Sequence, residues 1–377
     1  MAAESNKKPD RTAASAESQT WTRRDMLVRG AQTITAASVA AGAAWALHDP
    51  KGDAGLQPPE PITLKDYFSP VGFDPAAPRL SVAFGQPEAI DDLDAVQRMV
   101  DAALGGLDAE GIKRFIRRGD VVMLKPNVGF GRSPQLGATT NPQVVRAVIR
   151  LCREAGAAKI IVADNPIENP AACFAKSGIK RAAEAENASV AIHAKAYDAP
   201  VQIRPTAPDA AKNEALGIWS IFWKPLAQAD KVIGLPTIKD HNLCTASMSM
   251  KNWYGLLGGR RNQFHQAIHD IISDLGFMMK PTLIVADGTR VMMRNGPTGG
   301  RLDDVRVGGV AGRPVVVASV DQLATDSWCL QNLLGRDPAA LRYLELAYQK
   351  FGTDPSRLVA PSWQDYQRQG KLVETVC

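Results

Sequence analysis

The chain has 377 residues, of which 45% are hydrophobic and 22% are charged, so its bulk is globular rather than disordered, collagen-like or coiled-coil. The net charge of +5 is mild and dispersed, and no basic run is interleaved with aromatic residues, which argues against nucleic-acid binding. The five cysteines lie far apart and offer no ligand set for an iron-sulfur cluster, so a redox function would need a separate redox partner.

The N-terminal segment has the pattern of a twin-arginine export signal. Residues 22–27 read TRRDML, and a weakly apolar stretch follows over 31–47. Residues 44–46 read AWA, a cleavage site of the A-x-A type. We therefore predict a signal peptide over 1–46, the twin-arginine translocation machinery as a partner, and a periplasmic or extracytoplasmic location. A retained anchor is the alternative, although the apolar stretch is shorter than the roughly 20 residues that span a bilayer.

An extended approach segment rich in proline and glycine, 47–79, precedes alternating strands and helices. The clearest helix starts at the cap Asn141, followed by Pro142, and stops at Gly156. Strands are expected at 80–84, 120–124, 159–163, 231–235, 282–286 and 314–320, and helices at 91–104, 142–155, 248–257, 265–278, 322–334 and 338–351.

This alternation predicts an α/β fold with a mostly parallel sheet covered by helices on both faces. The α/β domain is expected over 80–340, and residues 341–377 are expected to form a C-terminal helical tail. Several short β-like runs between 190 and 220 predict a small β-rich insertion with antiparallel pairing.

Ligands of such sheets bind beyond the carboxyl ends of the strands, so the residues that follow each apolar run are candidate ligands. Lys125 and Asn127 follow the strand at 120–124, and Asn141 opens the next helix. A lysine, a glycine-containing loop and free helix amides suit an anion, although an ordinary capping loop is an equal alternative. Asp164, Asp287, Asp321 and Asp326 follow later strands. Single aspartates at strand ends usually form turns, but aspartates after three strands on one rim of the sheet favour a site there.

The segment 235–270 holds the densest set of reactive side chains. Lys251 lies in an apolar helix, where burial would lower its pKa and make it a nucleophile or a base. His241 could exchange protons near neutral pH. The alternative is a structural lysine paired with a carboxylate. Together with Lys125, this segment supplies positive or polar groups for a small anionic substrate, namely Lys239, Asn252 and Arg260, with Asp287 as a further binding residue.

His265 and His269 are four residues apart, which on an α-helix is the spacing of a metal-binding pair. The residue after the first histidine is Gln266 rather than glutamate, so a metallopeptidase is not indicated. Two buried, hydrogen-bonded histidines are the alternative. The sequence does not identify the cofactor. A metal and a covalently attached organic group are the two candidates.

At these residues the sequence resembles the domain of unknown function 362 family. The shared motifs are KPN at 125–127, TNP at 140–142, IKDH at 238–241, MKNWYGLL at 250–257, ADG at 286–288 and NGP at 295–297. The resemblance spans about 80–340 and implies an α/β fold with no agreed activity. Members are often fused to iron-sulfur ferredoxin modules, but this chain lacks the cysteines of such modules.

A more distant similarity is to the N-terminal domain of nickel-pincer lactate racemases. Lys251 follows His241 by ten residues, as the lysine that holds the cofactor follows a histidine in that family, and 257–259 and His265 resemble the turn and histidine that come next. One expected histidine is absent, since Asp164 stands near its place. The similarity implies a shared architecture rather than racemase activity.

Two hypotheses of different classes follow from the sequence. The first is an exported enzyme, dependent on a metal or an organic cofactor, that acts on a small anionic molecule through His241 and Lys251. The second is a non-catalytic extracytoplasmic protein that binds an anion or a metal with the same residues. Catalytic turnover discriminates between them.

Overall fold

The large sheet organises the fold in the computed structural model, which describes Thr22, Arg24 and residues 60–68, 73–202, 216–309, 312–352, 360 and 362–377. The predicted signal peptide and its cleavage site therefore lie outside the described residues, apart from Thr22 and Arg24. Residues Glu60–Cys377 form one compact unit. No helix within the described ranges combines the length and apolarity needed to cross a membrane.

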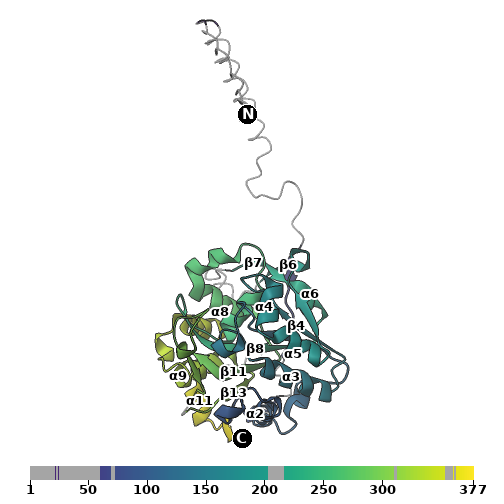
Figure 1. Ribbon diagram of the computed structural model, residues 1–377, viewed down its shortest axis with the longest axis vertical. Helices are drawn as coiled ribbons and strands as arrows, with labels where there is room; N and C mark the ends of the chain where they lie inside the picture. Colours follow the sequence, from purple (N-terminus) through teal and green to yellow (C-terminus); the bar gives the residue numbers. More distant parts are fainter. Residues whose placement is uncertain are drawn as a thin grey trace, which may run out of the picture. The chain divides into compact units, whose positions relative to one another are not determined.

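The main path of the sheet has eight strands and passes through the middle of the unit (Figure 1). Neighbouring strands are parallel except at one position, where a single strand runs antiparallel to both of its neighbours. The mostly parallel sheet is thus confirmed. In spatial order the strands are β14 (Leu372–Val376), β2 (Leu80–Phe84), the antiparallel β13 (Val315–Ser319), β11 (Leu283–Met292), β8 (Lys231–Leu235), β3 (Val121–Pro126), β4 (Lys159–Asp164) and β5 (Ser189–Ile192).

Helices cover both faces of this sheet, as predicted. Successive buried residues of a strand point to opposite faces, so Val122 and Leu124 of β3 join one apolar core while Met123 joins the other. One face carries α2 (Leu93–Gly105), α3 (Pro142–Glu154), α4 (Pro170–Lys176) and α5 (Ile179–Ala185). The other carries α6 (Trp223–Gln228), α7 (Ser249–Asn252), α8 (Ile268–Met278), α9 (Gln322–Asn332), α10 (Arg342–Phe351) and α11 (Trp363–Arg368).

The predicted β-rich insertion is a separate three-stranded sheet of β1 (Ile62–Thr63), β6 (Asp198–Gln202) and β7 (Ile218–Phe222). Strands β6 and β7 pair antiparallel. The run just before them, β5, instead extends the main sheet beside β4. Two short strands that the sequence analysis did not anticipate, β9 (Thr237–His241) and β10 (Thr245–Ser247), form a hairpin next to β11, and β12 (Val305–Val307) pairs with β11 as well.

Three elements depart from the expected ones. The residues expected as one helix at 248–257 form α7 followed by the 3₁₀ helix η6 (Trp253–Leu256), and η7 (Arg261–Ala267) is likewise a 3₁₀ helix before α8. Strand β11 continues to Met292, well beyond its expected end. The C-terminal segment contains α10 and α11 but ends in β14, which pairs with β2 and forms the edge of the sheet.

Aspartates after the predicted strands do not all reach one rim, contrary to the expectation. Asp321 follows β13, whose carboxyl end lies at the opposite edge of the sheet because β13 runs antiparallel to β11 and β2. Asp287 lies inside β11 rather than after it. Only Asp164, the last residue of β4, remains at the carboxyl edge of the parallel strands.

Candidate functional site

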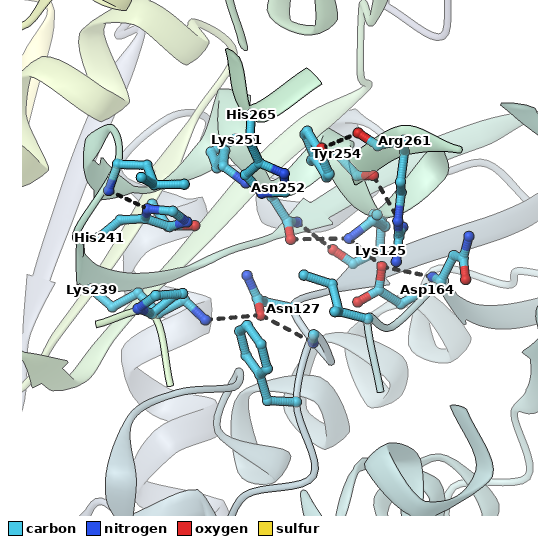
Figure 2. Close-up of a pocket in the computed structure, with 18 of the residues that line it drawn as sticks. Lys125, Asn127, Asp164, Lys239, His241, Lys251, Asn252, Tyr254, Arg261 and His265 are labelled. Atoms are coloured by element: carbon cyan, nitrogen blue, oxygen red, sulfur yellow. Dashed lines mark hydrogen bonds and ion pairs between the residues drawn. The ribbon is translucent and has the colours of Figure 1, made fainter. Parts of the chain in front are cut away.

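A cavity of about 260 Å³ lies where β3 and β4 end, beneath the β9–β10 hairpin and beside α7 and η6. Its size is near the lower end of small-molecule sites. Figure 2 shows polar side chains from these separate elements converging on one space, with Lys239 and His241 on one side and Asp164 and Arg261 on the other. Six of the residues predicted from sequence to be catalytic or to bind substrate line this cavity: Lys125, Asn127, Lys239, His241, Lys251 and Asn252.

Lys125 is fully enclosed at the end of β3 and is neutralised by Asp164 at the end of β4. The Lys125 Nζ lies 2.8 Å from Asp164 Oδ1, and both side chains are almost inaccessible to solvent. The same ammonium donates to Asn252 Oδ1 at 3.0 Å, while Asn252 Nδ2 donates to the Lys125 carbonyl at 2.8 Å. Burial nevertheless lowers the pKa of Lys125, against the opposing effect of Asp164.

Lys239 lies on β9 and has polar partners but no paired carboxylate among the described residues. Its Nζ donates to Asn127 Oδ1 at 3.3 Å and to the Ala138 carbonyl. The side chain is only 1% exposed. Burial, with a further contribution from the charge of Lys251, lowers the pKa of Lys239 to about 7. This lysine therefore changes its charge near neutral pH.

Lys251 has no hydrogen-bond or ion-pair partner among the described residues, although it is only 8% exposed. Its Nζ lies 4.0 Å from the centre of the Tyr254 ring, where the face of the ring attracts a cation. Burial lowers the pKa of Lys251 to about 8, and the charges of Arg261 and Lys125 act in the same direction. An unpartnered amine of this pKa is the group in the cavity best suited to act as a base or nucleophile.

The backbone around Lys251 is held by a buried carboxylate from α9. Asp326 accepts hydrogen bonds from the Ser249 N–H at 2.7 Å, from the Met250 N–H at 3.1 Å and from the Ser249 hydroxyl. Asp326 does not line the cavity. Its contribution is to fix the start of α7, and thereby the position of Lys251.

Two histidines line the cavity, and the Nδ1 atom of each has a backbone partner. Burial and the charges of Lys251 and Lys239 lower the pKa of His241 to about 3. His241 Nδ1 accepts from the Leu243 N–H at 3.2 Å, which ties the tip of the β9–β10 hairpin to the cavity. His265 Nδ1 lies 2.8 Å from the Asn262 carbonyl, and its ring packs 5.5 Å from that of Tyr254.

The arginine at the site is Arg261 rather than the predicted Arg260. Arg260 is exposed and does not line the cavity, whereas Arg261 is 7% exposed and does. Arg261 donates to the Pro166 carbonyl at 2.7 Å and to the Leu257 carbonyl at 3.3 Å, and burial lowers its pKa. Adjacent arginines after a glycine pair give the sequence no means of telling which one turns inward.

Asn141 and Asp287, predicted to bind substrate, are buried but do not line the cavity. Asn141 caps α3 through a hydrogen bond from Gln143 N–H, and its amide donates to Ile90 and Thr289. Asp287 accepts from the Asn141 N–H at 2.7 Å and from Thr289. Both residues therefore join α3 to β11 behind the site.

His269, predicted as a metal ligand with His265, lies outside the cavity with its ring stacked 6.1 Å from Tyr343. In a helix, residues four apart share a face only where it is α-helical, whereas residues 261–267 form a 3₁₀ helix and α8 starts only at Ile268. Within the part of the chain that the structure describes, no three His, Cys, Asp or Glu side chains are grouped to hold a metal ion.

The cavity has four basic side chains and one carboxylate among its described lining residues, so its charge favours an anion. Three polar lining residues, Asp164, Tyr254 and Arg261, were not among the predicted catalytic, binding or metal residues. Asp164 carried the same strand-end signal as Asp287, and Tyr254 follows Lys251 by one helical turn. Gly255 completes the enclosure, because any side chain at this position would enter the space of the Lys125–Asp164 pair.

The fold and the cavity define an α/β protein with a buried cationic site at the carboxyl ends of parallel strands. The chain belongs to the domain of unknown function 362 (DUF362) family, whose model matches residues 122–331, as the sequence motifs predicted. It is 30% identical over 254 residues to a thylakoid-associated protein from Synechocystis sp., an alignment covering 65% of this chain and 72% of the relative.

Among solved structures, a crystal structure of a protein from Thermotoga maritima is similar over 70% of this chain and 59% of its own, at 10% identity and a TM-score of 0.32. The chain thus spans less than two thirds of that protein. The similarity to nickel-pincer lactate racemases stays a prediction.

Replacing Gly255 with alanine is expected to disrupt the floor of the cavity. The added Cβ would lie 1.9 Å from Asp164 Oδ1 and 2.8 Å from Lys125 Nζ, so the buried pair must separate. We expect Gly255→Ala to lower the free energy of unfolding by about 1–3 kcal/mol, the usual effect of overpacking. Gly105→Ala is the matched control, because a Cβ there meets nothing within 4 Å, and it should stabilise the protein by about 0.4–1 kcal/mol. Urea denaturation of both variants measures these values, and equal stabilities would contradict the close approach.

Affinity for a non-titrating anion such as sulfate should fall as the pH rises from about 6 to about 9. Lys239 and Lys251 lose their protons at about pH 7 and about pH 8 in the free protein, whereas a bound anion favours the charged lysines. Each lysine that must take up a proton on binding weakens the affinity by up to about tenfold per pH unit. Calorimetric titration across this range tests the sign, and Lys239→Met should remove the part of the dependence that begins near pH 7. A pH-independent affinity would contradict the assignment.

Proposed function

We propose that this DUF362 protein is an enzyme that removes a proton from a small anionic substrate, with Lys251 as the base. The observation that carries the proposal is the Lys251 amine, which is buried, lacks a hydrogen-bond partner among the described residues and has its pKa lowered to about 8. A general base works best when its pKa lies near the operating pH. Lys251 meets this condition at a cavity that favours anions.

The other side chains supply binding and charge stabilisation. Lys125, Lys239 and Arg261 present buried positive groups that would hold the anion and stabilise the negative charge left when the proton departs. The proton moves to Lys251 Nζ, and the bonding electron pair stays on the substrate. The Tyr254 ring, 4.0 Å from Nζ, stabilises the ammonium that forms. His241 also lines the cavity, and a bound anion would raise its pKa. In this proposal His241 takes up a proton from solvent and returns it to the substrate.

A second candidate is a non-catalytic protein that binds an anion, because the excess of basic groups supports binding even without chemistry. A metal, or an organic cofactor joined to Lys251, extends either candidate. Intact-mass spectrometry and elemental analysis of protein purified after native export test this extension, since a covalent group would appear as added mass on the peptide that contains Lys251.

The enzyme and the binding protein differ in their response to two substitutions at Lys251. Arginine keeps the positive charge but cannot act as a base at neutral pH, whereas methionine removes both. With a panel of short 2-oxo and 2-hydroxy carboxylates in D₂O, we expect wild-type protein to exchange a carbon-bound proton, as followed by NMR. This proton is next to the carboxylate in a 2-hydroxy acid and next to the keto group in a 2-oxo acid. Lys251→Arg should retain anion binding and lose about 10²-fold or more of the exchange rate. Lys251→Met should lose both.

Lys159→Met is the matched control, because Lys159 is an exposed lysine at the opposite end of β4. It should leave binding and exchange unchanged. If wild-type protein binds these anions, loses the binding in Lys251→Met and yet exchanges no proton, the non-catalytic candidate is the better one.

We also propose that the protein is exported by the twin-arginine pathway. The TRRDML motif at 22–27 supports this, and a relative named as thylakoid-associated fits an extracytoplasmic or membrane-associated location. Replacing Arg23 and Arg24 together by lysine should leave the protein in the cytoplasm, as measured by cell fractionation and immunoblotting. Replacing Lys7 and Lys8 by alanine is the control that should still be exported. Export of the Arg23→Lys, Arg24→Lys variant would contradict the proposal.

A further inference from the structure

The mouth of the cavity differs in chemistry from its floor. The lysines and Arg261 at the floor are buried, whereas two lining residues that reach solvent are large and aliphatic, Ile167 at 49% exposure and Leu243 at 50%. Seven large hydrophobic residues are exposed among the described residues, and these two lie at the same opening. Phe130 and Pro297 add further apolar surface to the lining.

Ile167 is held at the opening by the backbone of its loop. The Ile167 N–H donates to the Gly129 carbonyl at 3.1 Å, and the preceding carbonyl, of Pro166, accepts from Arg261 at 2.7 Å. One residue earlier, Asn165 donates to the Leu257 carbonyl at 2.8 Å. The backbone that carries Ile167 is therefore held by the same hydrogen bonds that position Arg261 at the floor.

Leu243 is fixed from the other side, at the tip of the β9–β10 hairpin. Its N–H donates to His241 Nδ1 at 3.2 Å, so the tip is joined to a cavity residue. Below the tip, Asp240 accepts from the Gly296 N–H at 2.8 Å and from Arg336 at 2.6 Å. The hairpin thus exposes Leu243 to solvent in a defined position, where a polar side chain would be better solvated.

We propose that the ligand of this cavity is an amphiphilic anion: a carboxylate, phosphate or sulfonate head group among the lysines, carrying an apolar chain that covers Ile167 and Leu243. A purely polar anion would leave both side chains in water, whereas an apolar chain removes them from water at about 0.8 kcal/mol per buried methylene, or about fourfold in affinity. The inference rests on the proposed anion site and adds the class of substrate. Ile167 and Leu243 are then residues that determine specificity.

The test is a calorimetric series of n-alkyl sulfonates from methyl to octyl, used below micelle-forming concentrations. These anions share one head group that does not titrate in the working range. We expect affinity to rise by about fourfold for each methylene that reaches the mouth. Ile167→Ser and Leu243→Ser should flatten this dependence on chain length and leave methanesulfonate affinity unchanged. Val376→Ser, an exposed apolar residue on the edge strand β14, is the matched control and should behave as wild type.

The outcomes separate this inference from the proposed function. If wild-type protein binds methanesulfonate and octanesulfonate equally well, the apolar mouth has no part in ligand recognition, while the anion site stands. If the serine variants weaken methanesulfonate and octanesulfonate by the same factor, Ile167 and Leu243 only support the cavity, and the inference is wrong. If no sulfonate binds at any length, the anion site itself fails.

Discussion

The burial of four basic side chains opposite one carboxylate is the constraint on which the site depends. A buried ammonium loses the stabilisation that water gives it and must recover that stabilisation from hydrogen bonds and opposite charges in the protein. Lys125 recovers most through Asp164 and Asn252, Lys239 recovers less through an amide and a carbonyl, and Lys251 has only the face of an aromatic ring. This gradient in compensation separates the paired Lys125 from the reactive Lys251. It also leaves positive charge in the cavity that a bound anion would compensate.

The fold carries this cost because rigid elements position each group. Parallel strands β3 and β4 end at the same edge, so Lys125 and Asp164 are brought together by paired strands rather than by loops. The reactive lysine is held from a different direction, since Asp326 on α9 fixes the start of α7. Asp326, which the sequence analysis expected at a strand end, therefore acts behind the cavity rather than in it. Its role is to orient the backbone that carries Lys251.

The sequence predicted the sheet and six cavity residues because both follow from local signals: apolar runs set the strands, and side chains after a run lie near its carboxyl end. It misplaced Asp287, since nothing local shows that β11 continues to Met292. It favoured Arg260 over Arg261, because the sequence does not reveal that Gly259 adopts a left-handed conformation just before these two residues. His269 was wrongly paired with His265 because a 3₁₀ helix replaces the expected α-helix. The sequence does not show that Ile167 and Leu243 lie at one opening, because their loops are far apart in the chain and come together only in the fold.

A bound anion would change the pKa of Lys251, the residue proposed to act on it. Its charge favours the protonated form of every lysine nearby, so a substrate bound directly against Lys251 would raise the pKa of that amine and weaken it as an acceptor. A base at this position requires the anionic head to lie closer to Lys125, Lys239 and Arg261 than to Lys251. The charge of Lys251 then still contributes to binding, while the reacting carbon faces its amine. The apolar mouth favours this orientation, because a chain anchored at Ile167 and Leu243 restricts how the head can enter. In the proposed reaction, recognition at the opening and proton transfer at the floor would be coupled through the pose of one ligand.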